Sequence, residues 1–403
     1  MIKSTNRKRI GLLIELSREF GRDLCKGITE FAGERGDVDP VYLTPLELSQ
    51  LRSPCSFDGF IARVMNDKLA EILACTGKPV VDVFYEKPHP GFAVVKTNHA
   101  RVGSLAAEHF LSHRFTNFAF CGFADGRSSG YCLNGYRRAL RKAGYDCAIY
   151  TPENNARYDF DSGALINEKL NRAPDAQALT NFLGALAKPV AVFCPNDLRA
   201  YQLIQLCHEL KIEVPREVAI LGLDNDPIVC GFSRPMISSI DPNSAEIGRV
   251  AAATLMEMIE CKRPKIREII RTVNPDKVIT RASSETYPLN PPWLSDALIF
   301  INRHFHETMS AVDVCNYLGL SHTSVSDAFR RVLGTTVQKE IVALRLSRAC
   351  RLLNTTELGA ADIAKECGFA SVTYFTKTFT DAMGLPPIAY RNRERRADVN
   401  KMI

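Results

Sequence analysis

Two segments near the C-terminus repeat one another, and this repeat constrains the fold more than any other feature of the chain. Residues 313–320 (DVCNYLGL) match residues 362–369 (DIAKECGF) at an offset of 49. The match then continues at an offset of 50, which indicates one residue inserted in the second turn. The further paired positions are Ser321 and Ser371, Val325 and Phe375, Phe329 and Phe379, and Gly334 and Gly384. Two copies of one supersecondary unit are therefore predicted.

Each copy has the pattern of a helix, a glycine turn and a second, capped helix. Gly319 and Gly368 suit the left-handed conformation that ends a helix. Ser321 and Ser371 can cap the helix that follows, because a serine hydroxyl accepts from free backbone N–H groups. Apolar residues four apart in the second helix face inward together, so the residues between them are exposed. This pattern predicts two helix-turn-helix units, whose second helices enter the major groove of DNA. The alternative is a pair of ordinary packed helices, which would not require matched caps and glycines.

One helix is predicted between the two units, over Thr336–Leu353. Its length would be roughly 27 Å, and it could hold the two second helices about one turn of DNA, roughly 34 Å, apart. Three arginines lie along it, Arg345, Arg348 and Arg351. They are candidates for phosphate contacts, or for an ordinary solvated face.

The first 280 or so residues alternate short apolar runs with amphipathic stretches. The predicted strands are Ile10–Leu16, Gly59–Val64, Val80–Val83, Phe118–Gly122, Val190–Cys194 and Val218–Leu223. The predicted helices are Gly21–Ala32, Val102–Leu111, Gly135–Ala143, Leu198–Leu210 and Ala245–Ile259. Continuous apolar strands that alternate with helices indicate parallel sheets covered on both faces. The length exceeds one such sheet, so two α/β lobes are predicted.

A stretch with three prolines, residues 283–292, breaks both periodicities and is predicted to be a linker. It divides the chain into an α/β domain of residues 1–282 and an all-α domain of residues 293–403. No apolar run is long enough to span a membrane, and the thirteen cysteines form no C-x-x-C pair. Both features favour a cytoplasmic protein with reduced thiols. The net charge of +6 permits nucleic-acid binding without establishing it.

Polar residues follow the predicted strands of the α/β domain, where ligands bind in open sheets of this kind. Asp224 follows Val218–Leu223 and can accept two hydrogen bonds from sugar hydroxyls. The further candidates are Ser17, Arg18, Arg63, Asp125, Arg127, Asn196 and Asp197. Asn196 and Asp197 could instead cap the next helix. Phe20, Phe84 and Tyr85 could supply the aromatic face that a neutral sugar needs, although Phe20 could equally belong to the core.

The C-terminal repeat resembles the signature of AraC-type regulators. Residues 368–379 (GFASVTYFTKTF) and 384–391 (GLPPIAYR) carry this resemblance, which covers about the last hundred residues. The resemblance implies base-facing residues in both units. They are His322, Thr323, Ser326 and Asp327 in the first, and Val372, Thr373, Thr376 and Lys377 in the second. Arg330 is a further residue expected to contact DNA. Asp327 departs from the arginine often found there, and an acidic side chain can accept from cytosine but repels phosphate.

Residues 8–280 resemble the ligand domain of LacI-type regulators. The matching segments are residues 9–13 (RIGLL), 94–103 (VVKTNHARVG), 193–197 (FCPND) and 218–225 (VAILGLDN). Asn98 would belong to the sugar site, where these sensors commonly carry aspartate, and Cys132 stands where they often carry arginine. Both departures remove charge from the implied site.

The two resemblances together imply a periplasmic-binding-protein-like sensor of two α/β lobes, followed by an all-α DNA-binding domain. They imply a transcription regulator, expected to be an activator, that responds to a small sugar such as xylose. The implied partners are double-stranded operator DNA, the sugar, a second copy in a homodimer, and RNA polymerase, with no membrane.

Two other functions are open at this stage: a sugar-active α/β enzyme, and a sugar-binding protein without a DNA role. The segment that begins at Gly122 lacks the third glycine of a phosphate-binding loop. His109 and His113 stand four apart and could bind a metal ion, but ordinary surface or core histidines are the commoner outcome of such spacing. No catalytic residue, cofactor or metal is therefore predicted. The two DNA-reading units argue against a transport-type binding protein.

Overall fold

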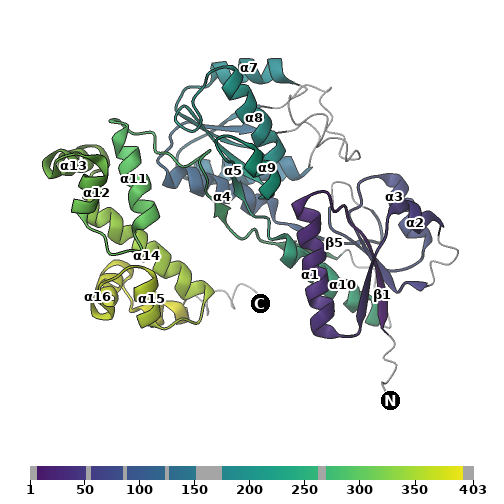
Figure 1. The fold of residues 1–403 in the computed structure, drawn as a ribbon. Helices are drawn as coiled ribbons and strands as arrows, with labels where there is room; N and C mark the ends of the chain where they lie inside the picture. The colour runs from purple at the N-terminus through teal and green to yellow at the C-terminus, as the bar shows by residue number, and fades with distance from the viewer. Residues whose placement is uncertain are drawn as a thin grey trace. The chain divides into compact units, whose positions relative to one another are not determined.

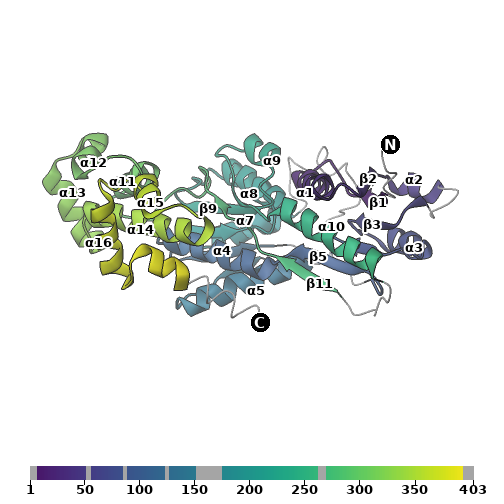
Figure 2. The same ribbon diagram turned by 90° about the horizontal axis from the view of Figure 1, so that it is seen from below.

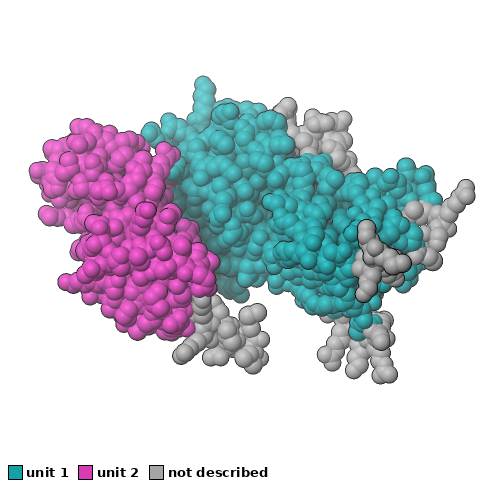
Figure 3. Space-filling model, turned by 60° about the horizontal axis from the view of Figure 1, so that its bottom comes forward, with its two compact units in different colours: residues 1–285 teal, residues 286–403 magenta. Residues whose placement is uncertain are grey.

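A computed structural model of the chain divides into two compact units, residues 1–285 and residues 286–403 (Figure 3). The structure describes residues 7–50, 56–84, 89–122, 127–150, 175–261 and 269–393. No helix within these ranges is both long and apolar enough to cross a membrane.

The first unit contains two sheets of six strands each (Figures 1 and 2). The first sheet has the order β11 (Ile270–Val273), β5 (Ala93–Thr97), β4 (Val80–Asp82), β3 (Gly59–Ala62), β1 (Lys8–Leu13) and β2 (Val38–Tyr42). The second has the order β12 (Val278–Ile279), β10 (Ser238–Ile240), β9 (Val218–Leu223), β8 (Val190–Phe193), β6 (Phe118–Cys121) and β7 (Ala148–Tyr150). The described strand pairs are parallel except β10 with β12. The α/β fold of two lobes is confirmed.

Helices cover both faces of each sheet, which explains why the central strands are apolar without alternation. On the first sheet, α1 (Glu19–Arg35) and α10 (Ser244–Glu260) pack on one face. The helices α2 (Pro45–Gln50) and α3 (Asp67–Cys75) pack on the other. On the second sheet, α4 (His99–Ser112) and α5 (Arg127–Lys142) pack opposite α7 (Ala176–Ala185) and α8 (Asp197–Glu209). A short helix, α9 (Pro227–Phe232), follows β9.

The crossing helices require glycine at close contacts. The helix α4 carries the chain from β5 in the first sheet to β6 in the second, and it packs tightly on α5. A Cβ atom at Gly135 of α5 would overlap the carbonyl oxygen of Ala100. A Cβ atom at Gly103 of α4 would likewise overlap the carbonyl oxygen of Cys132. These glycines therefore allow the two helix backbones to approach each other directly.

All six predicted strands and all five predicted helices of this unit are present, with ends that differ by a few residues. Six further strands were not predicted, namely β2, β5, β7, β10, β11 and β12. They are two to five residues long, and several are polar, as in the sequences VDPVY and SSI. Such short segments carry too little periodicity to be recognised without their neighbours in the sheet.

The second unit is helical and has two cores, one for each repeat. Its helices are α11 (Trp293–His304), α12 (Ala311–Leu318), α13 (His322–Ala328), α14 (Val337–Thr355), α15 (Ala360–Glu366) and α16 (Val372–Met383). A π-helical turn, η2 (Phe329–Leu333), continues α13. Phe329 is fully buried in the first core, and Phe375 and Phe379 are fully buried in the second.

The turns of both repeats have the expected local chemistry. Gly319 and Gly368 adopt left-handed φ angles of 65° and 77°. The hydroxyl of Ser321 accepts from the N–H of Ser324 at 3.2 Å, and that of Ser371 accepts from Tyr374 at 3.1 Å. The repeated helix-turn-helix pattern is therefore built by the same glycine and serine in each copy.

The predicted linker, residues 283–292, is not a free spacer at its ends. Ser283 and Ser284 are completely buried within the first unit. Tyr287 and Leu289 pack against the first core of the second unit. Proline content alone could not show this, because the anchoring contacts of these residues are made by distant parts of the chain.

Candidate ligand pocket and nucleic-acid interface

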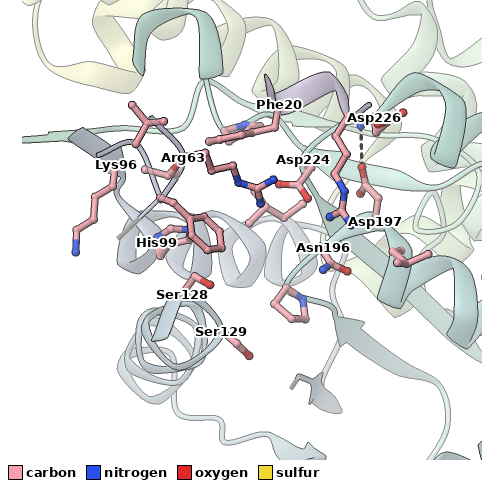
Figure 4. Close-up of a pocket in the computed structure, with 18 of the residues that line it drawn as sticks. Phe20, Arg63, Lys96, His99, Ser128, Ser129, Asn196, Asp197, Asp224 and Asp226 are labelled. Atoms are coloured by element: carbon pink, nitrogen blue, oxygen red, sulfur yellow. Dashed lines mark hydrogen bonds between the residues drawn. The ribbon is translucent and has the colours of Figure 1, made fainter. Parts of the chain in front are cut away.

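A cavity of about 130 Å³ lies where the carboxyl ends of strands from both sheets of the first unit meet (Figure 4). The first sheet and its helices contribute Arg18, Phe20, Arg63, Phe84 and Lys96, and the start of α4, which connects the two sheets, contributes His99. The second contributes Ser128, Ser129, Asn196, Asp197, Asp224 and Asp226. This is the position at which open α/β sheets bind ligands.

Arg63 follows β3 and is held within the cavity by rings and charge. Its guanidinium group lies 4.5 Å from the ring centroid of Phe84 and 5.8 Å from that of Phe20. It also forms an ion pair with Glu15 at 3.1 Å. Figure 4 shows the guanidinium pointing toward Asp224. The rings and the carboxylate thus hold this cationic side chain in one position at the wall of the cavity.

Asp224 follows β9 and faces the arginines from the other sheet. Its φ angle is 104°, a left-handed value that a non-glycine residue rarely adopts. Burial raises the pKa of Asp224 to about 7, although the charges of Arg18 and Arg63 favour the carboxylate. The group therefore exchanges its proton near neutral pH, and it can both donate to and accept from a hydroxyl group.

Arg18 precedes α1 and lines the same cavity. Its Nε is buried and has no hydrogen-bond partner in the described part of the chain. This donor requires a ligand or a solvent molecule, because a buried polar group without a partner is costly.

Asn196 and Asp197 follow β8 and are held by the protein itself. Asn196 caps α8, because its side chain accepts from the N–H of Arg199 at 2.8 Å. Asp197 is 2% exposed and accepts from Ser239 Oγ at 2.5 Å and from the N–H of Asp226 at 2.9 Å. Burial raises the pKa of Asp197 well above its usual range. Asp197 therefore lines the wall of the cavity with oxygens that already have partners.

Asn98 is a correction to the sequence-based site. It does not line the cavity but caps α4, accepting from the N–H of Arg101 at 3.2 Å. Its amide also donates to Asn274 Oδ1 at 2.9 Å, where the chain passes between the two sheets. The residue lies next to the pocket in sequence, but the start of α4 directs its side chain into this cap. Asp125 and Tyr85 lie outside the described residues.

Several lining residues were not predicted, and His99 is the most informative. It is the first residue of α4, and burial followed by the charge of Lys96 lowers its pKa to about 4. A neutral imidazole at pH 7 carries one donor and one acceptor, and a hydrogen bond to the backbone of Thr97 uses one of its two nitrogens. The signal was available in principle, because His99 follows β5, but that strand was not recognised. Asp226 was also missed; it caps α9 and accepts from the N–H of Glu19, on the other side of the cavity, at 3.2 Å.

His109 and His113 are core residues with partners in the protein. Both are buried, and His109 Nε2 lies 2.8 Å from the hydroxyl of Ser284. Within the described ranges, no group of three or more His, Cys, Asp or Glu side chains could hold a metal ion.

The residues predicted to face DNA bases lie on the outer sides of α13 and α16. His322, Thr323 and Asp327 are exposed in the first helix-turn-helix unit, and Val372, Thr373 and Lys377 in the second, while Ser326 and Thr376 are half-buried. Arg330, in the turn η2 that follows α13, is exposed as well. A shallow hollow runs along α16, lined by Val372, Thr373, Thr376, Lys377, Thr380 and Asp381. The buried phenylalanines on the opposite side of this helix fix which side chains reach the surface.

Arg345 is a second correction, because it cannot reach a phosphate group from its buried position. It is 6% exposed, and its Nε and Nη2 donate to the carbonyls of Phe305 at 2.7 Å and Glu307 at 2.8 Å. Arg391 does the same in the second repeat, donating to Leu353 at 3.0 Å and Leu358 at 2.5 Å. Both arginines thus hold the chain between two helices of their own unit.

Arg348 has only part of its side chain at the surface. It lies 3.5 Å from Glu366 and 6.0 Å from the ring centroid of Phe305. Arg351, one turn further along α14, is exposed. Of the three arginines of α14, Arg351 is therefore the most accessible.

Known proteins match both parts of the chain. The periplasmic binding protein-like domain matches residues 107–284, and a helix-turn-helix domain matches residues 314–393. The xylose operon regulatory protein of Escherichia coli (strain K12) is 24% identical over 399 residues, which is 96% of this chain and 98% of that protein. The solved structure of a xylose-binding transcription activator, also 24% identical, covers 96% of this chain and 98% of its own, with a TM-score of 0.57.

The likeness runs through both domains in the same order. The chain carries a periplasmic binding protein-like match followed by a helix-turn-helix match, and its similarity to the xylose operon regulatory protein spans both. The first unit is also similar to a LacI family regulator from Enterococcus faecium solved with bound ribose, which covers 70% of this chain with 21% identity and a TM-score of 0.51. The prediction of a periplasmic-binding-protein-like domain joined to a helix-turn-helix domain is thus confirmed, and the relatives named here are regulators of transcription.

Proposed function

We propose that this chain is a transcription regulator that binds operator DNA through its two helix-turn-helix units and responds to a small neutral sugar. The observation that carries the proposal is the presence, in one chain, of the Arg63–Asp224 cavity and of two matched reading helices. Because relatives over nearly the whole chain are named for xylose, xylose or a related monosaccharide is the proposed effector.

The cavity suits a neutral polyhydroxyl compound. Arg18 and Arg63 supply donors, Asp224 supplies a carboxyl group that accepts or donates, and the rings of Phe20 and Phe84 supply flat apolar faces. A sugar has hydroxyl groups at its edge and C–H groups on its faces, so this combination fits both. The proposed function is regulatory rather than catalytic, since these groups are arranged for binding.

On DNA, the proposed base-reading residues are the exposed side chains of α13 and α16, with Lys377 at the centre of the exposed side of α16. Arg330, Arg348 and Arg351 would contact phosphates. We propose activation by a homodimer in the cytoplasm, with RNA polymerase as the protein that the bound dimer recruits. A dimer would bring four reading helices to DNA, which suits operators with two half-sites.

The test combines sugar binding and DNA binding by the full chain. Operator DNA would first be selected from a random-sequence duplex pool, and its affinity then measured with and without xylose. We expect xylose to change the affinity of the operator but not that of unrelated duplex DNA. Calorimetry across pentoses and hexoses would identify the effector. Absence of any sequence-selective duplex would exclude the regulator, and absence of sugar binding would exclude the sensor.

Lys377→Ala provides the matched test on the DNA side. Loss of this exposed side chain should relax the preference at one base position, costing about 1–3 kcal/mol for the preferred operator. Lys339→Ala, at an exposed position near the start of α14, is the control and should leave the base preference unchanged. Equal effects of Lys377→Ala on all sequences would show a phosphate contact instead of base reading.

A further inference from the structure

The last residues of the sensor unit are fixed to its core. Ser283 donates through its N–H to the carbonyl of Met236 at 3.0 Å, and its hydroxyl donates to the carbonyl of Ile220 at 2.7 Å. The N–H of Ile220 donates in turn to the carbonyl of Ser283 at 2.7 Å. The hydroxyl of Ser283 also accepts from the N–H of Ser238 at 2.8 Å. Ser283 is therefore attached to both β9 and β10.

Ser284 extends this attachment to a helix. It is completely buried, and its hydroxyl lies 2.8 Å from Nε2 of His109, in the last turn of α4. His109 is itself 8% exposed. Residues 283 and 284 of the sensor are thus hydrogen-bonded to β9, β10 and α4.

The helical unit begins with an equally firm attachment. Thr286 is 6% exposed, and its hydroxyl lies 3.3 Å from that of Ser295 in α11. The N–H of Tyr287 donates to the same serine hydroxyl at 2.9 Å. Glu285, between Ser284 and Thr286, is held to the sensor as well, because its N–H donates to the carbonyl of Arg281 at 3.2 Å. We call residues 283–286 the junction.

Two rigid elements of the sensor each have one end at the cavity and the other at the junction. On β9, Asp224 follows the strand at the cavity, and Ile220 contacts Ser283 four residues earlier, roughly 13 Å along the strand. On α4, His99 lines the cavity, and His109 contacts Ser284 ten residues later, about 15 Å along the helix.

We propose that the junction transmits sugar binding to the DNA-binding unit through these two elements. The inference rests on the proposed function and adds its physical route. Because β9 and α4 pack in one core, a sugar bound to Asp224 and His99 would displace the two elements together. Since Ser283 is bonded to β9 and Ser284 to α4, the junction would move with both elements. Glu285 and Thr286 are also hydrogen-bonded, so the displacement would pass on to α11, whereas a flexible linker would not transmit it.

A flexible insertion tests the route directly. Six Gly and Ser residues would be placed between Glu285 and Thr286 of the full chain, and the same six after Gly144, an exposed turn residue, as the control. The measured quantity is the ratio of operator affinities with and without xylose, which for allosteric proteins is typically about 5–150-fold. We expect the junction insertion to reduce this ratio to less than about twofold, with the xylose affinity unchanged, and the control to retain it.

A point variant tests the helical branch of the route. Ser284→Ala removes the bond to His109 and should lower the xylose-dependent ratio severalfold without abolishing xylose binding. Ser112→Ala is the matched control, because its hydroxyl bonds to the carbonyl of His109 within the same helix but does not contact the junction. Thermal unfolding of each variant would verify that it is folded.

The outcomes separate this inference from the function on which it rests. A wild-type chain that binds neither xylose nor a selected operator overturns the proposed function. A wild-type chain that responds to xylose, together with a junction insertion that responds equally, overturns the route and leaves the function intact. Loss of the response in both insertion variants also overturns the route, because the effect would then not depend on the junction.

Discussion

At the residue scale, the cavity combines charges that partly cancel, and this balance defines its chemistry. Asp224 faces two arginines, yet burial holds its pKa near 7 rather than near its usual value. His99 is held neutral by burial, with its pKa near 4. The groups facing a ligand are thus able to exchange hydrogen bonds without requiring a ligand charge. Such groups suit the hydroxyl groups of a sugar.

The first prediction concerns the affinity for xylose. Asp224→Ala should weaken binding at least tenfold, because a hydrogen bond to a charged group contributes about 1.5–3 kcal/mol. Isothermal titration calorimetry on the full chain measures this. Asp39→Ala is the control, since Asp39 pairs only with Arg9 at the surface among the described residues, at 3.7 Å. An unchanged affinity in Asp224→Ala would place the sugar elsewhere.

The second prediction concerns stability against pH in the sugar-free protein. The pKa of Asp224 is raised from 3.8 to about 7 on folding, so the folded state binds its proton more tightly than the unfolded state does. The contribution of this group to stability therefore falls as the pH rises through this range and levels off above it. Asp224→Asn lacks this dependence. Its stability relative to wild type should increase by about 2–3 kcal/mol between pH 5 and pH 8.

Denaturant unfolding of the wild type and of Asp224→Asn at both pH values provides the measurement. Comparing the two chains cancels the groups that they share. Parallel pH profiles would show that Asp224 is ionised throughout this range, so that its charge would dominate the cavity.

At the scale of elements, the two helix-turn-helix units depend on a buried arginine each. Arg345 and Arg391 donate to carbonyls at the end of one helix and in the segment before the next. Carbonyls at helix C-termini lack partners within the helix, and a cation is favourable there. Each repeat therefore contains, besides its glycine turn and serine cap, a buried arginine that holds two of its helices together. This explains why an arginine that the sequence suggested for phosphate binding is directed inward.

The third prediction follows from this role. Arg345→Ala should destabilise the helical unit by about 2–4 kcal/mol, because it leaves two carbonyls without partners. The sole tryptophan of the chain, Trp293, lies at the start of α11, so its fluorescence follows unfolding of this unit alone. Arg351→Ala, at an exposed position of the same helix, should change stability by no more than about 0.5 kcal/mol. Similar losses in the two variants would contradict a special role for Arg345.

At the scale of the whole molecule, the chain consists of two units with separate cores and a very short connection. Each core is complete within its own unit, which favours independent folding. The helical unit begins at Thr286 rather than at the start of α11, because Tyr287 and Leu289 belong to its first core.

The fourth prediction concerns the isolated helical unit. A fragment of residues 286–403 should fold and bind the selected operator without any effect of xylose. A fragment of residues 293–403 should be less stable by about 2 kcal/mol, because it lacks the partly buried side chains of Tyr287 and Leu289. Trp293 fluorescence during denaturant unfolding compares the two. Equal stability would show that residues 286–292 act only as a spacer, and an unfolded longer fragment would show that the sensor completes its core.

The sequence alone predicted the division into an α/β part and a helical part, the repeat, and the order of the strands and helices that have strong periodicity. These depend on local signals, namely apolar periodicity, glycine turns such as Gly319, and caps such as Ser371. It also identified Arg18, Arg63 and Asp224 as cavity residues, because the end of a strand can be located from the chain alone. Asn196 remained open between ligand and cap until its bond to Arg199 was seen.

Only the tertiary structure decided which polar side chains are accessible and which have partners in the protein. The Asn98 amide could bind a sugar, but it is hydrogen-bonded to Asn274. The Arg345 guanidinium could bind a phosphate, but it donates to two backbone carbonyls instead. Ser283 and Ser284 appeared to belong to a flexible linker, yet they are bonded to β9, β10 and α4. The physical reason is the same in each case: a buried polar group takes whichever partner the fold brings within reach, and sequence spacing does not record that distance.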